Sequence, residues 1–144
     1  MQNPPLVQAL QRTGYKNAHT TLYDTILTPD LSHIKVQLLT PHAKGPTRAT
    51  LTSAGLDLYC PSEVVVEPHS IAIVATDSSI EPITGTYAQV ATTGNFTQQG
   101  ISILSGVIDP NYRGKITIVF HNSTTTPFYI DQNICFAQLI MKRI

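Results

Sequence analysis

The feature that most constrains the fold is a series of short β-patterned segments, which recur at intervals of roughly ten residues from Ile34 onward. Each segment is rich in β-branched, aliphatic and aromatic residues, and Pro, Gly and Asn residues lie between the segments. Many short strands at even spacing predict an all-β sandwich or barrel. The predicted strands are residues 34–39, 55–60, 62–67, 70–76, 85–93, 100–108, 115–122, 127–130 and 135–141.

The first 33 residues have a different pattern, so we divide the chain into an N-terminal extension, residues 1–33, and a β domain, residues 34–144. Asn3 and Pro4 have the residue types of a helix start, and Gly14 has that of a helix end. The rest of the extension has no clear period. We therefore expect an extension with one short helix or irregular structure.

Composition narrows the classes of partner. The 144 residues suit one domain, only 12% of them are charged, and the formal net charge is zero. Such a chain does not attract nucleic acid or an anionic membrane over long range, and a weakly charged surface favours self-association. No apolar run is long enough to cross a bilayer, and the start of the chain does not resemble a signal peptide. We expect a cytoplasmic or nuclear protein without nucleic-acid or membrane partners. Cys60 and Cys135 have no metal-ligand spacing.

Three stretches, taken in order, identify a family. SAGLDLY at 53–59, GVIDPNYRGKI at 106–116 and AQLIMKRI at 137–144 resemble the first, third and fourth motifs of the trimeric dUTPases. The resemblance implies a jelly-roll-like β-barrel that forms a homotrimer, with each active site built from several subunits. It also implies hydrolysis of dUTP to dUMP and pyrophosphate with Mg²⁺, by attack of water at the α-phosphorus.

The resemblance also assigns roles to residues of this chain. Asp109 would orient and activate the attacking water, and Tyr112 would pack under the deoxyribose and leave no room for a 2′-hydroxyl. Asp57 would hold the metal through its water shell, and Gln138 would contact a phosphate or a metal-bound water. Backbone groups of the hairpin before Asp109 would read uracil, and they include Gly106, Val107 and Ile108.

Three of these assignments have a structural alternative. Asp109, Pro110 and Asn111 form a good turn sequence, so Asp109 could serve the turn alone. Tyr112 could be an aromatic residue of the barrel wall, and Asp57 a strand-edge carboxylate. We expect Arg113 to be structural rather than a phosphate ligand.

Other positions depart from the family pattern. The Arg-Ser-Gly run of the second motif is replaced here by Thr93, Gly94 and Asn95, which leaves Thr93 and Gly94 as the nearest substrate-side residues. The Gly-Asp-Arg of the fourth motif is replaced by residues 133–135, and residues 1–144 contain no glycine-rich fifth motif. Each lost charge-assisted hydrogen bond is worth about 1.5–3 kcal/mol.

These departures favour a catalytically impaired or inactive dUTPase-fold protein. We expect it to act as a trimeric scaffold that retains a weak site for dUTP or dUMP and binds an unknown protein partner. The alternative is an active Mg²⁺-dependent dUTP diphosphatase in which Lys44, Arg48 or Lys115 replaces the lost cations. A third possibility is a structural β-barrel with no nucleotide site.

Overall fold

The computed structural model describes residues 20–24, 33–47, 55–104 and 106–144. Twelve strands and one short helix form in this part of the chain. They are β1 (Thr20–Asp24), β2 (His33–Leu38), β3 (Leu56–Tyr59), β4 (Val64–Val66), β5 (Ile71–Ala75), β6 (Ser78–Glu81), β7 (Thr86–Ala91), α2 (Gly94–Gln98), β8 (Ile101–Leu104), β9 (Val107–Ile108), β10 (Thr117–Asn122), β11 (Phe128–Ile130) and β12 (Cys135–Arg143). The predicted all-β jelly-roll class is confirmed, since every predicted segment contains a strand.

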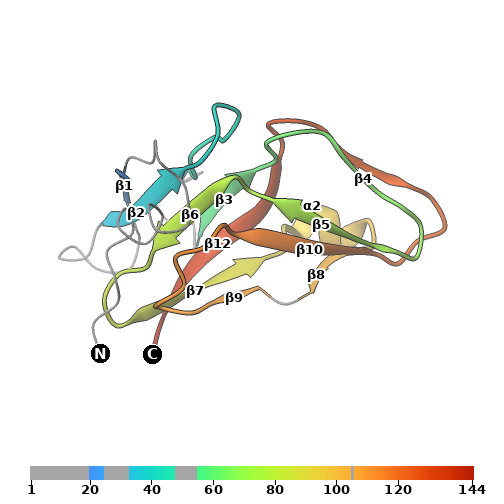
Figure 1. Ribbon diagram of the computed structural model, residues 1–144. Coiled ribbons are helices and arrows are strands. Elements are labelled where there is room, and N and C mark those ends of the chain that lie inside the picture. Colours follow the sequence, from blue (N-terminus) through green and yellow to red (C-terminus); the bar gives the residue numbers. More distant parts are fainter. Residues whose placement is uncertain (1–19, 25–32, 48–54, 105) are drawn as a thin grey trace.

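Four antiparallel sheets make up the barrel. The largest has the order β3-β12-β7-β9, and the others are β5-β10-β8, β1-β2-β6 and β11-β4. Figure 1 shows β12, the longest strand, running through the molecule between β3 and β7. Neighbours in these sheets are mostly distant in sequence, as expected for a jelly roll.

The core follows from the alternation of side chains along each strand. Thr86, Ala88 and Val90 of β7 are buried, while the residues between them are half-buried on the other face. Phe120 of β10 and Phe136 of β12 are fully buried, and their ring centroids lie 5.5 Å apart. This aromatic pair joins two of the four sheets in the centre of the barrel.

The helix α2 was not predicted. Thr93 caps it, since its side-chain hydroxyl accepts the backbone N–H of Phe96 at 3.4 Å. Phe96 is buried, and its ring centroid lies 5.0 Å from that of Phe128 in an edge-on arrangement. One aromatic side chain therefore joins a helix of a single turn to the core.

The structure also places a strand in the predicted extension. β1 pairs antiparallel with β2, from Thr20 opposite Gln37 to Asp24 opposite His33. The predicted helix near Asn3 to Gly14 lies outside the described residues, and the division at residue 33 stays a prediction. Within the described residues, no helix has the length and apolar character needed to cross a bilayer.

Candidate functional site

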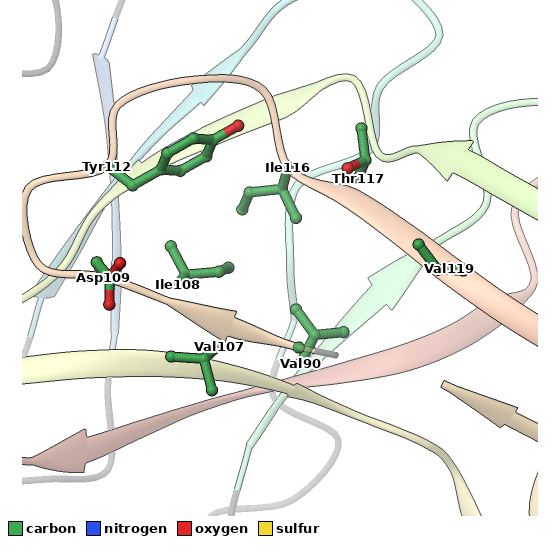
Figure 2. Close-up of a pocket in the computed structure, with 9 residues that line it drawn as sticks. Val90, Val107, Ile108, Asp109, Tyr112, Ile116, Thr117 and Val119 are labelled. Carbon is green, nitrogen blue, oxygen red and sulfur yellow. The ribbon is translucent and has the colours of Figure 1, made fainter. Parts of the chain in front are cut away.

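A pocket of about 230 Å³ lies where β7, β9 and β10 meet the turn that follows β9. In Figure 2, Asp109 and Tyr112 lie at one end of this pocket and Val90 and Val119 at the other. Five of the predicted site residues meet here, while the other lining residues were not predicted from the sequence. The lining residues are Val90, Gly106, Val107, Ile108, Asp109, Tyr112, Ile116, Thr117 and Val119.

A close approach of two backbones builds the pocket wall. The Gly106 carbonyl accepts the N–H of Val90 at 2.7 Å. A Cβ at Gly106 would lie 2.2 Å from the Val90 carbonyl oxygen, so only glycine allows this contact. The predicted uracil-reading hairpin, Gly106 to Ile108, therefore lies against β7.

Asp109 both forms a turn and lines the pocket. Its backbone carbonyl accepts the N–H of Tyr112 at 3.1 Å, and Pro110 occupies the second position of this turn. The Asp109 side chain is exposed and so is available to a ligand. The turn and the catalytic interpretations of Asp109 are therefore compatible.

The Tyr112 side chain is held at its hydroxyl end. Its hydroxyl donates to the Lys115 carbonyl at 2.7 Å, and a Cβ at Gly114 would lie 2.7 Å from the hydroxyl oxygen. The residue is still 45% exposed, so its ring is accessible from the pocket side. This geometry suits a platform for an apolar sugar face.

Arg113 is structural, as expected. Its Nη1 donates to the Pro110 carbonyl at 2.7 Å and to the Tyr112 carbonyl at 3.3 Å, and its Nη2 lies 3.5 Å from Glu81 Oε1. Burial lowers the pKa of Arg113 and the charge of Glu81 acts in the opposite direction. The side chain is buried among these contacts, in agreement with a structural role.

A second group of predicted residues lies elsewhere on the same sheet. Asp57 of β3 pairs with Gln138 of β12, which pairs with Ala91 of β7, so the three side chains share one face. β3 and β9 are the two edges of this sheet. Three steps of about 4.8 Å place Asp57 roughly 14 Å from β9, so Asp57 and the Asp109 pocket do not form one site within a chain.

The remaining predicted residues lie beside this second group. Thr93 and Gly94 lie two and three residues beyond Ala91, the end of β7, and the Thr93 hydroxyl is used in the cap of α2. Of the proposed replacement cations, Lys44 lies 3.9 Å from the ring centroid of Tyr59 on β3. Lys115 is half-buried, and Arg48 lies outside the described residues.

Cys135 lies at the start of β12 and is half-buried. Burial raises the pKa of this thiol, and the negative charge of Asp57 raises it further. Burial also raises the pKa of Cys60. The described residues contain no cluster of three or more His, Cys, Asp or Glu side chains that could hold a metal ion.

Comparison with known proteins decides the family. A family model described as dUTPase matches residues 41–144. The chain belongs to the dUTPase family. The deoxyuridine 5′-triphosphate nucleotidohydrolase of Candida albicans is 38% identical over 112 residues, which are 77% of this chain and 70% of the relative. That of Fowl adenovirus A serotype 1 is 37% identical over 120 residues, which are 81% of this chain and 67% of the relative.

Solved dUTPases share the fold. The dUTPase of phage phi11 of S. aureus superimposes with a TM-score of 0.73 at 22% identity, covering 77% of this chain and 90% of the phage chain. The dUTPase of Staphylococcus phage 80alpha, solved with dUpNHpp, has a TM-score of 0.72 at 22% identity and covers 77% of this chain and 82% of its own. These likenesses support the jelly-roll assignment.

Proposed function

We propose that this protein binds deoxyuridine nucleotides in the Asp109 pocket and hydrolyses dUTP to dUMP and pyrophosphate. The observation that carries this proposal is the meeting of Asp109, Tyr112 and the Gly106 hairpin around one pocket. The named nucleotidohydrolases at 37–38% identity favour an active enzyme over the inactive scaffold that the sequence departures had favoured.

The chemistry assigned to the pocket is local. The Asp109 carboxylate orients a water molecule toward the α-phosphorus and accepts a proton from it as the water attacks. The Tyr112 ring packs against the deoxyribose and excludes a 2′-hydroxyl. Backbone N–H and C=O groups of the hairpin from Gly106 to Ile108 hydrogen-bond to uracil, while Val90 and Val119 supply an apolar wall.

Mg²⁺ fits the donors present only as an ion that keeps most of its water. Asp57 supplies one half-buried carboxylate, and Gln138 beside it supplies a neutral amide oxygen. Mg²⁺ is commonly bound by one or two carboxylates together with waters and substrate phosphates, so this pair is compatible with it. The ion would neutralise phosphate charge when bound.

A homotrimer would resolve the separation of the two groups. Since Asp57 and Asp109 lie on opposite edges of one sheet, we propose that the Asp109 pocket of one subunit faces the Asp57 and Gln138 group of another. Lys44, which lies over Tyr59 on the Asp57 side, is then the described cation placed to contact the phosphates. A monomeric protein with full activity would contradict this arrangement.

The test is dUTP turnover with purified full-length protein. Release of dUMP and pyrophosphate is measured with Mg²⁺ and with EDTA, beside titrations of dUMP and UMP. We expect Mg²⁺-dependent turnover and preference for dUMP over UMP. Replacing Lys44 with Gln should lower kcat/KM for dUTP by about tenfold, one charge-assisted contact, and should leave dUMP affinity nearly unchanged.

A second candidate is a nucleotide-binding scaffold without turnover. It is favoured by the segment after β7, where Thr93 caps α2 and no residue of Gly94–Gln98 carries a charge. Binding of dUMP without turnover would support this scaffold and contradict the hydrolase. Absence of both binding and turnover would contradict both candidates and direct the search to protein partners.

A further inference from the structure

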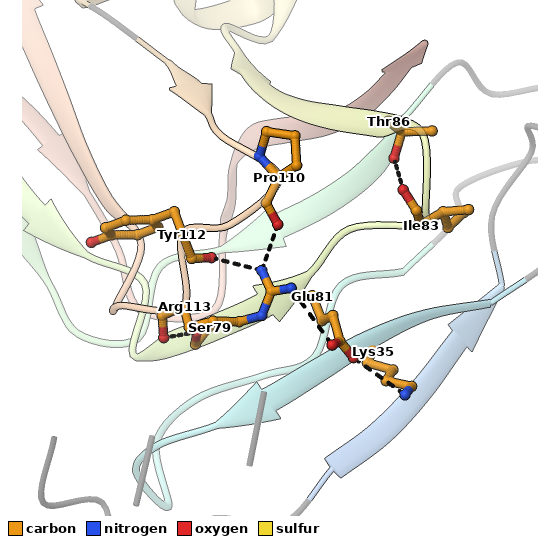
Figure 3. Close-up of polar contacts among 8 residues, drawn as sticks. All are labelled: Lys35, Ser79, Glu81, Ile83, Thr86, Pro110, Tyr112 and Arg113. Carbon is orange, nitrogen blue, oxygen red and sulfur yellow. Dashed lines mark hydrogen bonds and ion pairs between the residues drawn. The ribbon is translucent and has the colours of Figure 1, made fainter. Parts of the chain in front are cut away.

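Strand β6 lies under the pocket turn without lining the pocket. Its residues Ser79 and Glu81 are two apart, so their side chains point to the same face. Both reach Arg113 in the turn above, one at the backbone and the other at the guanidinium. Figure 3 shows these contacts together.

Arg113 is held at both ends. The Ser79 hydroxyl donates to the Arg113 carbonyl at 2.7 Å, and Glu81 Oε1 lies 3.5 Å from Nη2. The same guanidinium donates through Nη1 to the carbonyls of Pro110 and Tyr112, which belong to the turn that carries Asp109. A planar guanidinium can serve both partners at once, which a lysine ammonium cannot do in the same geometry.

The exit of the turn is attached to the same strand. The N–H of Ile116 donates to the Ser78 carbonyl at 2.9 Å, and the Ile116 carbonyl accepts the N–H of Thr76 at 3.0 Å. Burial strengthens the ion pair between Arg113 and Glu81, because these side chains are only 4% and 16% exposed. Lys35, opposite Glu81 on β2, is 54% exposed and lies at the solvent end of the group.

We propose that Ser79 and Glu81 are positioning residues for the nucleotide pocket, which act through Arg113 to fix the orientation of Asp109 and Tyr112. This inference rests on the proposed function, because it assigns Tyr112 to the sugar and Asp109 to the attacking water. Neither Ser79 nor Glu81 lines the pocket. Their effect on specificity is therefore transmitted through the turn.

The sharpest variant is Glu81→Gln, which keeps the shape of the side chain and removes its charge. Ser79→Ala removes one hydrogen bond and is the milder second variant. Glu67→Gln is the matched control, since it makes the same chemical change at an exposed residue just beyond β4. Two readouts are needed, amide hydrogen exchange within residues 109–116 and the ratio of dUMP to UMP affinity.

We expect Glu81→Gln to speed exchange of the Tyr112 amide and to lower the dUMP to UMP affinity ratio by about 10–100-fold, the range for a hydrogen bond to a charged group. Ser79→Ala should change both by about 2–10-fold. The affinity ratio separates positioning from general destabilisation, because partial unfolding lowers the affinity for both nucleotides equally.

Unchanged exchange at Tyr112 together with an unchanged affinity ratio would overturn the inference. Faster exchange spread evenly over all strands would also overturn it, since that pattern reports global destabilisation. If the unmodified protein binds neither nucleotide, the proposed function fails, and the exchange comparison with Glu67→Gln alone decides whether β6 fixes the turn.

Discussion

Two segments that follow strands of the same sheet use their polar groups in opposite ways. The turn after β9 directs the Asp109 carboxylate and the Tyr112 ring toward a pocket, while a buried arginine binds its backbone carbonyls. The segment after β7 uses the Thr93 hydroxyl to cap α2 and buries Phe96 in an aromatic cluster.

The difference concerns which polar side chains remain exposed. In the pocket turn the backbone is held by Arg113, which does not line the pocket, and the Asp109 and Tyr112 side chains stay exposed. In the α2 segment the polar side chain that could face a phosphate already has a partner within the helix. Three predictions test this contrast and a fourth concerns Cys135 on β12, in order from the largest expected effect to the smallest.

Removing the charge of Asp109 should have the largest effect. In Asp109→Asn we expect kcat for dUTP to fall by about 10²–10⁴-fold, because a positioned base is lost. Affinity for dUMP should stay within about threefold, since asparagine also favours this turn. Single-turnover kinetics and calorimetry measure the two quantities. Retained turnover would place water activation at another residue.

A methyl group at Gly106 should disrupt the pocket wall. In Gly106→Ala the added Cβ meets the Val90 carbonyl, so we expect the free energy of unfolding to fall by about 1–3 kcal/mol and dUMP binding to weaken. Gly94→Ala is the matched control in the other segment, where a Cβ meets nothing within 4 Å. Urea unfolding of both variants provides the comparison, and equal losses would refute the crowding argument.

Adding a cation to the α2 segment should partly replace the arginine that the second motif of the family pattern has there. In Thr93→Arg we expect kcat/KM for dUTP to rise by about tenfold, because one charge-assisted contact outweighs the lost helix cap. Thr93→Ala removes the helix cap without adding a charge, so it measures the effect of losing the cap alone. If the affinity for dUMP rises by the same factor as kcat/KM for dUTP, the added arginine does not contact the β- and γ-phosphates.

The smallest effect concerns Cys135 and alkaline pH. A thiol whose pKa is raised in the folded state stabilises the fold below its ordinary pKa near 9.0, and this stability is lost as pH rises through the folded value. We therefore expect the thermal midpoint to fall between about pH 8 and about pH 10, and to fall less in Cys135→Ser. The remaining fall reflects Cys60, whose pKa is also raised. Identical pH profiles would exclude a contribution from Cys135.

The sequence predicted much of the fold because local patterns control it. Period-two alternation in residues 115–122 predicts β10. The Asp109-Pro110 pair predicts the turn that precedes this strand. β6 was missed because its segment, SSIE, has two serines where a typical strand has β-branched residues. The helix α2 was missed because five residues are too few to show a helical period.

The residues of the candidate site also divide into those that a local motif predicts and those that it does not. Motif residues from 106 to 112 were predicted as one group, and they line one pocket because they are close in sequence and belong to one hairpin and turn. Val90 was missed because β7, which is distant in sequence, brings it to that pocket, and Thr117 and Val119 were missed because they lie on β10 beyond the motif. Nothing local marks those three residues as ligand-facing.

The sequence by itself determined the strand-rich class, the turn at Asp109 and the family, since these depend on short patterns and ordered motifs. The tertiary structure decided that Asp57 and Asp109 lie on opposite edges of one sheet, and that Ser79 and Glu81 support the pocket turn from below. The physical reason is that strand order and the packing of a turn on a distant strand depend on long-range pairing, which no local pattern specifies.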